Sequence, residues 1–428
     1  MKGLQFDVLV VGAGPAGLAA AAGGAESGAT IGLIDDNPQP GGQIWRGGPG
    51  AVHTDQAAHW LRRAAAPNVR LLTRTRVVAA PDAGRLIADT ASGPIELAYG
   101  HLILSCGARE LFLPFPGWTL PGVFGAGGLQ ALVKGGMPIK GKRVVVAGSG
   151  PLLLAAASYL TGKGARVTAV IEQTPWRKLA AFSFHLLTDW DKLRQAGRLG
   201  GSLRRVPFRA GAWVVRARGA DRLEAVTVRH RGGAWMLECD YLACGFGLIP
   251  NLALPRALGC AVVEGTVPVD ERQRTSRDHI YAAGEVTGVA GLEAALAEGR
   301  IAGLAATRQA AEARALFPSR VHAHRFAAAL SRGFTLRDEL KTLADPDTLV
   351  CRCEDVPYAA VCGHASWRSA KLHTRCGMGP CQGRVCGGAS AFLFGWTQDS
   401  VRAPITPCTL GSLAEVSAPL KTEEKVVQ

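Results

Sequence analysis

The hydrophobic pattern at the start of the chain predicts a buried strand that runs into a helix of small residues. Residues 6–11 (F-D-V-L-V-V) are almost entirely apolar, and the turn G-A-G-P-A-G separates them from an alanine-rich run ending near Ser27. A second apolar strand, T-I-G-L-I, follows and ends at Asp35. Short unbroken apolar runs that alternate with a helix are typical of a parallel sheet covered on both faces. The pattern therefore predicts a βαβ unit.

The turn between the first strand and its helix has the glycine spacing of a phosphate-binding loop. Gly12, Gly14 and Gly17 follow G-x-G-x-x-G. Gly12 makes the tight turn, Gly14 lets a pyrophosphate approach the backbone, and Gly17 lets the helix pack closely on the strand. The helix N-terminus presents unpaired N–H groups to the phosphates. Asp35, about 20 residues on, is placed to bind a ribose hydroxyl. These residues predict a dinucleotide site.

A second strand, loop and helix begin at Lys142 with K-R-V-V-V-A-G-S-G-P-L-L-L. Gly148 and Gly150 hold the first two glycine positions, and the following strand ends at Glu172. The third position is Leu153, whose side chain we expect to displace the helix and reshape the phosphate pocket. The unit predicts a second Rossmann-like fold. It leaves open whether a nucleotide, NAD(P) or ATP, binds there.

The segments around these units predict strands and crossing points. Residues 69–79 and 85–104 alternate enough to predict strands of a small meander. A buried strand, H-L-I-L-S-C-G, ends at Gly107, and P-F-P-G-W then breaks the chain. Near residue 280, the strand I-Y-A-A-G-E ends at Gly284 and Glu285, followed by a predicted helix over 291–303.

Composition and charge exclude several classes of protein. The 428 residues are 48% hydrophobic and 19% charged, which is typical of a globular protein. The net charge of +14 comes mostly from arginines, dense between Arg194 and Arg231, without the aromatic pattern or helix-turn-helix of a nucleic-acid reader. We expect solvated faces or a partner surface there, and no nucleic acid. No apolar run predicts a transmembrane segment or a signal peptide, so we expect a cytoplasmic protein.

Six of the eleven cysteines lie between residues 351 and 386. Cys351 and Cys353 form a C-x-C pair, and Cys376, Cys381 and Cys386 form two overlapping C-x4-C pairs. Clustered thiolates suit an iron–sulfur cluster or zinc, and their spacing does not distinguish the two. No cysteine precedes Cys106, which disfavours the redox pair of a flavin disulfide reductase. No residue set predicts a general base or a nucleophile, so we name no catalytic residue.

The combined motifs resemble one family of flavoproteins. They are G-A-G-P-A-G, P-G-G-Q-I-W-R, G-S-G-P-L-L-L, A-A-G-E-V-T-G and C-R-C-E-D-V with H-T-R-C-G-M-G-P-C-Q-G-R-V-C. The chain resembles the A or α subunits of opine oxidases and of D-hydroxyproline and related proline dehydrogenases, together with the middle (B) subunit of hydrogen cyanide synthase. The resemblance implies an α/β, glutathione-reductase-like flavoprotein with two dinucleotide-binding domains and a small C-terminal [2Fe–2S] (BFD-like) domain.

The resemblance also implies cofactors and their ligands. It places FAD on the first loop and adds Gly42, Gln43, Val77, Gly107, Gly284 and Glu285 to its binding residues. Glu285 departs from the family, which has Asp at this position. For [2Fe–2S], Cys351, Cys353, Cys381 and Cys386 match the ligands, with Cys376 as the alternative. The expected domains are 1–120 with 265–330 for FAD, 121–264 for the second Rossmann-like unit, and 345–428 for the cluster.

The resemblance implies an electron-transferring member of a hetero-oligomeric amine or imino acid dehydrogenase, with oxidation at a flavoprotein β subunit. A small γ subunit is a further candidate partner. D-Hydroxyproline or an opine is the expected substrate. Two alternatives stay open: a self-contained NAD(P)H-dependent reductase and a zinc-stapled nucleotide-binding scaffold. The apolar block A-F-L-F-G-W (391–396) would face a partner or pack under the cluster domain.

Overall fold

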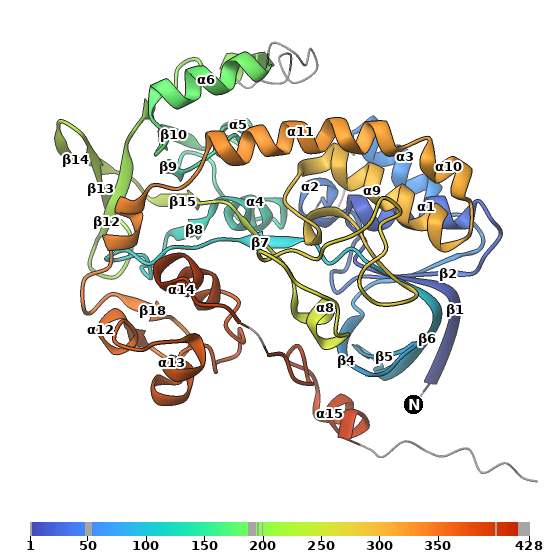
Figure 1. The fold of residues 1–428 in the computed structure, drawn as a ribbon. Helices are drawn as coiled ribbons and strands as arrows, with labels where there is room; N and C mark the ends of the chain where they lie inside the picture. Colours follow the sequence, from blue (N-terminus) through green and yellow to red (C-terminus); the bar gives the residue numbers. More distant parts are fainter. Residues whose placement is uncertain are drawn as a thin grey trace, which may run out of the picture.

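A computed structural model describes residues 2–47, 54–186, 194, 197–198, 200–398 and 400–417. The described chain forms a mixed sheet, a parallel sheet and a cysteine-rich region, residues 345–417 (Figure 1). The first sheet lies at the right of the view, the second at the left, and the cysteine-rich helices lie below the second. Most of the stretch 187–199, which opens the predicted arginine-rich surface, lies outside the described residues.

The first sheet has the strand order β3-β2-β1-β6-β5-β4, and β17 also pairs with β6. β6 is long and joins two parts: it pairs in parallel with β1 and β17, and antiparallel with β5. Because the carboxyl ends of parallel strands meet at one edge, this edge gathers the loops that follow β1, β2, β6 and β17. The strands are β1 (Lys2–Val11), β2 (Ile31–Ile34), β3 (Val69–Leu72), β4 (Arg76–Asp82), β5 (Arg85–Thr90), β6 (Gly93–Leu104) and β17 (Ile280–Ala282).

The predicted strand over residues 69–79 is divided in two. β3 ends at Leu72 and joins the parallel part, whereas β4 starts at Arg76 and belongs to the antiparallel meander. Arg74, between them, has a left-handed backbone with φ of 51°, and its N–H donates to the carbonyl of Asn37. A left-handed residue ends an extended run because it turns the chain, so alternation alone could not locate this break.

Helices α1 (Pro15–Ala25) and α9 (Gly291–Ala306) lie side by side against the first sheet. Their backbones touch: a Cβ on Gly299 would lie 2.0 Å from the carbonyl oxygen of Ala16, and one on Gly303 would lie 2.1 Å from that of Ala20. Small residues therefore set the distance between the helices. Nearby helices are α2 (Gly42–Trp45), α3 (Asp55–Arg63) and α10 (Ala310–Arg314), and the short η1 (Gly284–Val286) precedes α9.

The second sheet is a parallel sheet of order β11-β10-β9-β15-β8. An antiparallel sheet, β12-β13-β14, packs beside it. The elements are β8 (Val123–Gly125), α4 (Ala126–Lys134), β9 (Arg143–Gly148), α5 (Leu152–Gly162), β10 (Arg166–Glu172), α6 (Trp176–Leu186), β11 (Phe208–Ala210), β12 (Trp213–Arg218), β13 (Ala225–His230), β14 (Gly233–Glu238) and β15 (Tyr241–Gly245). Helix α8 (Ala253–Ala257) packs back against β4 of the first sheet. Two linkers connect the sheets and pair with each other, β7 (Ala108–Glu110) and β16 (Leu248–Pro250).

Helix α11 (Phe317–Gly333) crosses from the first sheet toward the second and packs against α6 (Figure 1). The cysteine-rich region follows it. The short η2 (Asp338–Thr342) precedes this region. The region itself consists of β18 (Leu349–Cys351), β19 (Val356–Pro357), α12 (Tyr358–Val361), α13 (Trp367–Thr374), α14 (Cys386–Phe394) and α15 (Leu410–Ser417). Of the block 391–396, Phe394 stacks on Tyr358 and contacts Trp396, while Phe392 packs against the core of the second sheet. These side chains therefore pack within the chain. None of the described helices has the length and hydropathy to span a membrane.

The contact between α1 and α9 gives a stability prediction. Substitution Gly299→Ala should destabilise the protein by about 1–3 kcal/mol, because the new methyl group overlaps the backbone of α1. Gly162→Ala is the matched control, since nothing lies within 4 Å of the added Cβ. Urea unfolding followed by tryptophan fluorescence compares them. Equal stability of the two variants would contradict the close contact.

Candidate functional site

The first glycine loop is shaped by close backbone contacts. Gly12 has φ of +104°, and a Cβ there would lie 2.3 Å from the carbonyl oxygen of Ser105. A Cβ on Gly17 would lie 1.8 Å from the carbonyl oxygen of Gly12. A Cβ built on Gly14 would have one neighbour within 4 Å among the described residues outside the adjacent ones, the Cα of Gly42 at 3.9 Å. Gly14 thus faces another glycine, and no side chain of the described residues covers its backbone.

Asp35, at the end of β2, holds this loop from the side. Its Oδ2 accepts a hydrogen bond of 2.7 Å from the Ala13 N–H, and its Oδ1 accepts bonds of 2.8 Å from the backbone and side-chain nitrogens of Asn37. The residue is 8% exposed. A carboxylate offers about four acceptor sites, so it retains capacity for a ribose hydroxyl.

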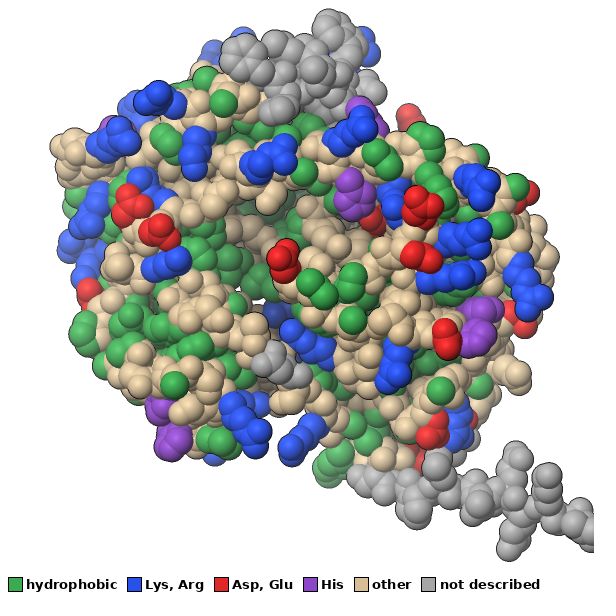
Figure 2. Space-filling view, viewed as in Figure 1, with side chains coloured by type: hydrophobic (Ala, Val, Ile, Leu, Met, Phe, Trp, Pro, Cys, Tyr) green, Lys and Arg blue, Asp and Glu red, His purple; other side chains and the backbone are tan. Residues whose placement is uncertain are grey.

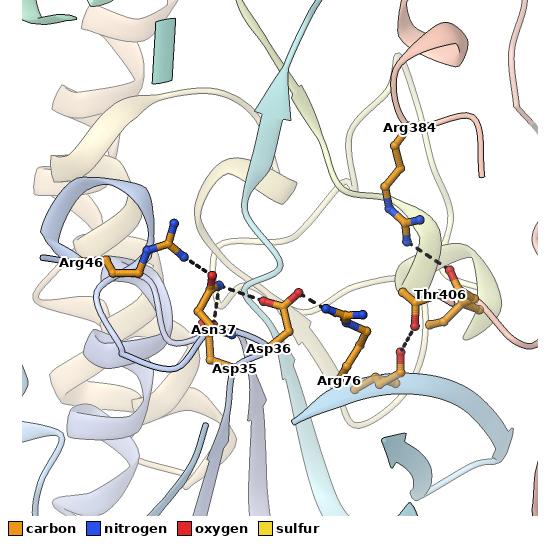
Figure 3. A network of polar contacts seen from close by, with 9 residues as sticks. Asp35, Asp36, Asn37, Arg46, Arg76, Arg384 and Thr406 are labelled. Atoms are coloured by element: carbon orange, nitrogen blue, oxygen red, sulfur yellow. Dashed lines mark hydrogen bonds and ion pairs between the residues drawn. The ribbon is translucent and has the colours of Figure 1, made fainter. Parts of the chain in front are cut away.

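Charged residues flank the segment that follows Asp35 (Figure 3). The Arg46 guanidinium donates to the Asn37 side-chain oxygen, and the Asn37 amide donates to Asp36 at 2.8 Å. Arg76 lies on the other side, with its Nε 3.8 Å from an Asp36 oxygen. The adjoining strand β4 carries Val77, whose carbonyl accepts a hydrogen bond from Thr406.

The predicted residues Gly42 and Gln43 lie in helix α2, opposite the glycine loop. Gly42 faces Gly14, since a Cβ on it would lie 3.0 Å from the Cα of Gly14. The Lys134 ammonium, on α4, donates to the carbonyl of Gln43 at 2.9 Å. This contact holds α2 against α4, a helix of the second sheet.

The end of β6 connects the glycine loop to both linkers. The Ser105 hydroxyl lies 2.9 Å from the carbonyl oxygen of Val11 and 2.8 Å from that of Gly12. Asn251, just after β16, donates through its side chain to the Cys106 carbonyl and through its backbone N–H to the Gly107 carbonyl. Burial raises the pKa of Cys106 to about 12. The thiol therefore stays protonated and is a poor nucleophile.

A buried carboxylate fixes the turn at Gly284. Glu298, on α9, is 2% exposed. Its Oε2 accepts from the Gly284 N–H at 2.7 Å and from the Thr287 hydroxyl at 2.8 Å, and its Oε1 lies 2.6 Å from Nε2 of His324. The neighbouring Glu285 has no hydrogen-bond donor among the described residues, and burial raises the pKa of its carboxyl. Glu285 is therefore a desolvated carboxyl with its hydrogen-bonding capacity unused.

The second glycine loop has the same plan with its third position altered. Glu172, 2% exposed, accepts from the Gly150 N–H at 2.7 Å and from the Thr174 N–H at 2.8 Å. Leu153 is buried, and a Cβ on Gly245 would lie 2.9 Å from its Cδ2. Gly245, at the end of β15, therefore provides the space that the leucine needs. The sequence could not indicate this, because the two residues are far apart in the chain.

The segment Phe334–Arg337, called the strap below, covers the second loop. The Ser149 hydroxyl donates to the Phe334 carbonyl at 3.1 Å, and the Phe334 ring lies 3.9 Å from a Cβ built on Gly150. Gln173 donates to the Thr335 carbonyl at 3.2 Å and accepts from the Arg337 N–H at 3.2 Å. The Arg337 guanidinium lies 3.7 Å above the Trp213 ring. The first loop faces a glycine, Gly42, whereas the second faces the phenylalanine side chain and the backbone of the strap.

The structure brings all five candidate cysteine ligands into one neighbourhood. The sulfurs of Cys351, Cys376 and Cys386 lie within 4.8 Å of one another, and all three residues are buried. The Cys353 thiol contacts both the backbone and the side chain of Cys381. The alternative ligand Cys376 thus lies in the group with two of the four predicted ligands.

The hydrogen bonding within this group favours thiolate at Cys351, whereas it raises the pKa of the Cys376 and Cys386 thiols that donate to it. Hydrogen bonds from the Cys376 and Cys386 thiols lower the pKa of Cys351 to about 2, and the Gly377 N–H lies 3.5 Å from its sulfur. Thiolates are what iron–sulfur and zinc sites require. The donor set therefore fits a metal centre bound by sulfur.

Residues just after Gly107 connect the linker to the cysteine-rich region. Arg109 donates through Nε to the Arg384 carbonyl at 2.8 Å. Glu110 accepts from the Gly127 and Gly128 N–H groups at the start of α4, at 2.7 and 2.9 Å, and burial raises the pKa of its carboxyl. Sequence reasoning missed Arg109, Glu110 and Glu298; charged residues directly after a buried strand were the one signal for the first two.

The fold and its two glycine loops define an α/β oxidoreductase with paired dinucleotide-binding units. The chain belongs to the pyridine nucleotide-disulphide oxidoreductase family, whose sequence model matches residues 6–313. That family supports FAD as a cofactor. The chain is 35% identical to the HcnB subunit of hydrogen cyanide synthase from Pseudomonas aeruginosa, over 90% of this chain and 91% of that one. It is 30% identical to the A subunit of opine oxidase from Agrobacterium tumefaciens, over 96% and 92%.

Among solved structures, L-proline dehydrogenase from P. horikoshii matches with a TM-score of 0.66 at 21% identity, over 96% of this chain and 80% of that one. Thioredoxin reductase of T. acidophilum matches with a TM-score of 0.55 at 24% identity, over 72% and 99%. Both likenesses concern the fold. The resemblance inferred from the motifs, to opine oxidase and hydrogen cyanide synthase subunits, is confirmed by the sequence relatives.

The buried Glu298 gives a test of the site. Glu298→Ala should weaken FAD retention about tenfold or more, because it leaves the buried Gly284 N–H unpaired, at a cost of about 1–3 kcal/mol. Flavin per chain and FAD affinity of the stripped protein measure the effect. Exposed Glu312→Gln on α10 is the control. Unchanged FAD affinity in Glu298→Ala would show that this turn does not position the cofactor.

Proposed function

We propose that the chain is the electron-transfer subunit of a hetero-oligomeric amine or imino acid dehydrogenase. It holds FAD at the first glycine loop and a [2Fe–2S] cluster at the cysteine group. The names of the relatives support this role, because the hydrogen cyanide synthase and opine oxidase relatives are both described as subunits. An opine or D-hydroxyproline is the proposed substrate class, oxidised on a flavoprotein β subunit. A small γ subunit is a further candidate partner.

The observation that carries this proposal is the short connection between the two cofactor sites. Ser105 hydrogen-bonds to the first glycine loop, and Arg109, four residues later, hydrogen-bonds to Arg384 between two of the proposed cluster ligands. A second connection runs from Val77 through Thr406 and Ile405 to Arg384 (Figure 3). Electron transfer between cofactors depends on such proximity, and it requires no acid–base residues.

The proposed FAD site is formed by residues of three loops at one sheet edge. Gly12 and Gly17 shape the loop and Gly14 receives the pyrophosphate, Asp35 binds the ribose, and the desolvated Glu285 binds a ribityl hydroxyl. Gly42, Gln43, Val77, Gly107 and Gly284 complete the binding residues. FAD, when bound, accepts two electrons and passes them on singly. The surface in Figure 2 is hollowed at its centre, and Lys and Arg side chains gather below this hollow. Their positive charge favours an anionic cofactor.

We propose Cys351, Cys353, Cys381 and Cys386 as the cluster ligands, in a C-terminal domain over 345–428. The domains over 1–120 with 265–330 and over 121–264 hold FAD and the second Rossmann-like unit. A zinc site is the alternative, because the same thiols suit it. The cysteine loop, residues 376–386, contacts the FAD linker, residues 105–110, through the hydrogen bond from Arg109 to the Arg384 carbonyl. This contact favours a redox centre, since a structural zinc site does not need to lie near the flavin.

The strap disfavours a self-contained NAD(P)H-dependent reductase. A dinucleotide at the second loop would need the space in front of Gly150, where Phe334 lies. The hydrogen bonds of Ser149 and Gln173 to the strap would also have to break. We therefore propose that the partner subunit delivers the electrons, and that Gly148, Gly150 and Glu172 bind no nicotinamide cofactor.

Metal analysis tests the cluster. The chain purified anaerobically with its associated subunits should contain about two iron and two labile sulfide per chain. Cys353→Ser and Cys386→Ser should lose both, whereas Cys376→Ser and the exposed Cys362→Ser should retain them. Zinc without iron would favour the scaffold alternative, and loss of iron in Cys376→Ser would revise the ligand set.

Reduction by nicotinamide nucleotides tests the strap. Stopped-flow mixing with NADH or NADPH should leave the flavin of the wild-type protein oxidised on the timescale of turnover, whereas dithionite reduces it. Rapid bleaching by either nucleotide would restore the NAD(P)H-dependent reductase as the better hypothesis.

A further inference from the structure

Two arginines lie between the FAD linker and the cysteine loop. Arg109 donates through Nε to the Arg384 carbonyl at 2.8 Å, and through Nη1 to the Pro250 carbonyl at 3.1 Å and the Asn251 side chain at 3.2 Å. Arg384 donates to the Cys381 carbonyl at 3.3 Å and to the Ile405 carbonyl at 3.2 Å. Together they join both linkers to the loop that carries Cys381 and Cys386.

Neither arginine has an anionic partner in the described part of the chain. All the acceptors of their hydrogen bonds are neutral oxygens. No carboxylate oxygen of the described residues lies within 4.0 Å of either guanidinium, the distance that defines an ion pair. Other arginines of the chain do meet a carboxylate: Arg143 lies 3.0 Å from Asp240, and Arg375, in the cysteine-rich region, lies 2.7 Å from Glu354. The charges on Arg109 and Arg384 also repel each other. Arg109 and Arg384 are both partly buried. Partly desolvated charges without a counter-ion are costly, so the site favours an anion.

Two sources of negative charge interact favourably with these arginines: Cys381 with both, and Asp36, less strongly, with Arg384 alone. Arg384 lies three residues after Cys381 and two before Cys386. We propose that Arg109 and Arg384 supply the counter-charge of the thiolate-bound cluster and thereby raise its reduction potential. This inference rests on the proposed function, because it requires the cluster at these cysteines.

Electrostatics fixes the direction of the effect. A cluster with four thiolates is anionic, and the one electron delivered from reduced flavin adds a further negative charge. Fixed positive charge stabilises the reduced form more than the oxidised form, so it raises the potential. Arginine remains protonated throughout, so the compensation requires no accompanying proton. The positive charges of Arg109 and Arg384 thus stabilise the reduced cluster, and this favours electron transfer from flavin to cluster.

The test is a redox titration of the cluster in the purified complex, followed by electron paramagnetic resonance. Arg109→Gln and Arg384→Gln should each disfavour reduction about tenfold, which lowers the midpoint potential by about 59 mV for a one-electron couple. Arg109→Lys and Arg384→Lys keep the charge and should stay near the wild-type potential. Arg368→Gln, on the exposed surface of α13, removes the same charge and should change nothing.

The outcomes separate the two proposals. A wild-type complex without iron would overturn the proposed function and this inference with it. A cluster present in the glutamine variants at the wild-type potential would overturn the inference alone. If the glutamine variants lose the cluster, retention of iron in the lysine variants supports the charge role, and loss of iron in both series overturns it.

Discussion

The contact between the first glycine loop and the end of β6 is the constraint on which the rest of the molecule depends. Gly12 and Gly17 approach Ser105 and each other so closely that no side chain fits. The Ser105 hydroxyl then bonds to the carbonyls of Val11 and Gly12. This contact fixes the loop around Gly14 and sets the direction in which the chain leaves β6. The linker to Arg109 and to the cysteine loop starts from that point.

The two glycine loops show how one local plan serves different ends. Both have an acid at the end of the next strand that accepts an N–H from the loop, Asp35 in the first and Glu172 in the second. The first loop faces another glycine, whereas the strap lies across the second. The second unit therefore supplies a hydrophobic core and the residues to which the strap is hydrogen-bonded. The difference between the two loops supports a single flavin in this chain.

Local features were predictable from the sequence, and long-range ones were not. The strand, turn and helix around Gly12 and around Gly148 follow from apolar runs and glycine spacing, which act over a few residues. The break at Arg74, the space that Gly245 provides for Leu153, and the strap over Ser149 depend on backbone conformation or on contacts between distant segments. The cysteine spacing indicated a sulfur-bound metal, but it could not show that Arg109 ties that loop to the linker. The binding roles of the site residues stay predictions.

The central claim is that flavin and cluster form one electron path within this chain. Stepwise anaerobic reduction of the purified complex tests it most directly, with flavin absorbance and the paramagnetic signal of reduced iron–sulfur followed together. We expect the iron signal to develop as electrons enter through the flavin and to reach about one spin per chain. Complete bleaching of the flavin without any iron signal would contradict it.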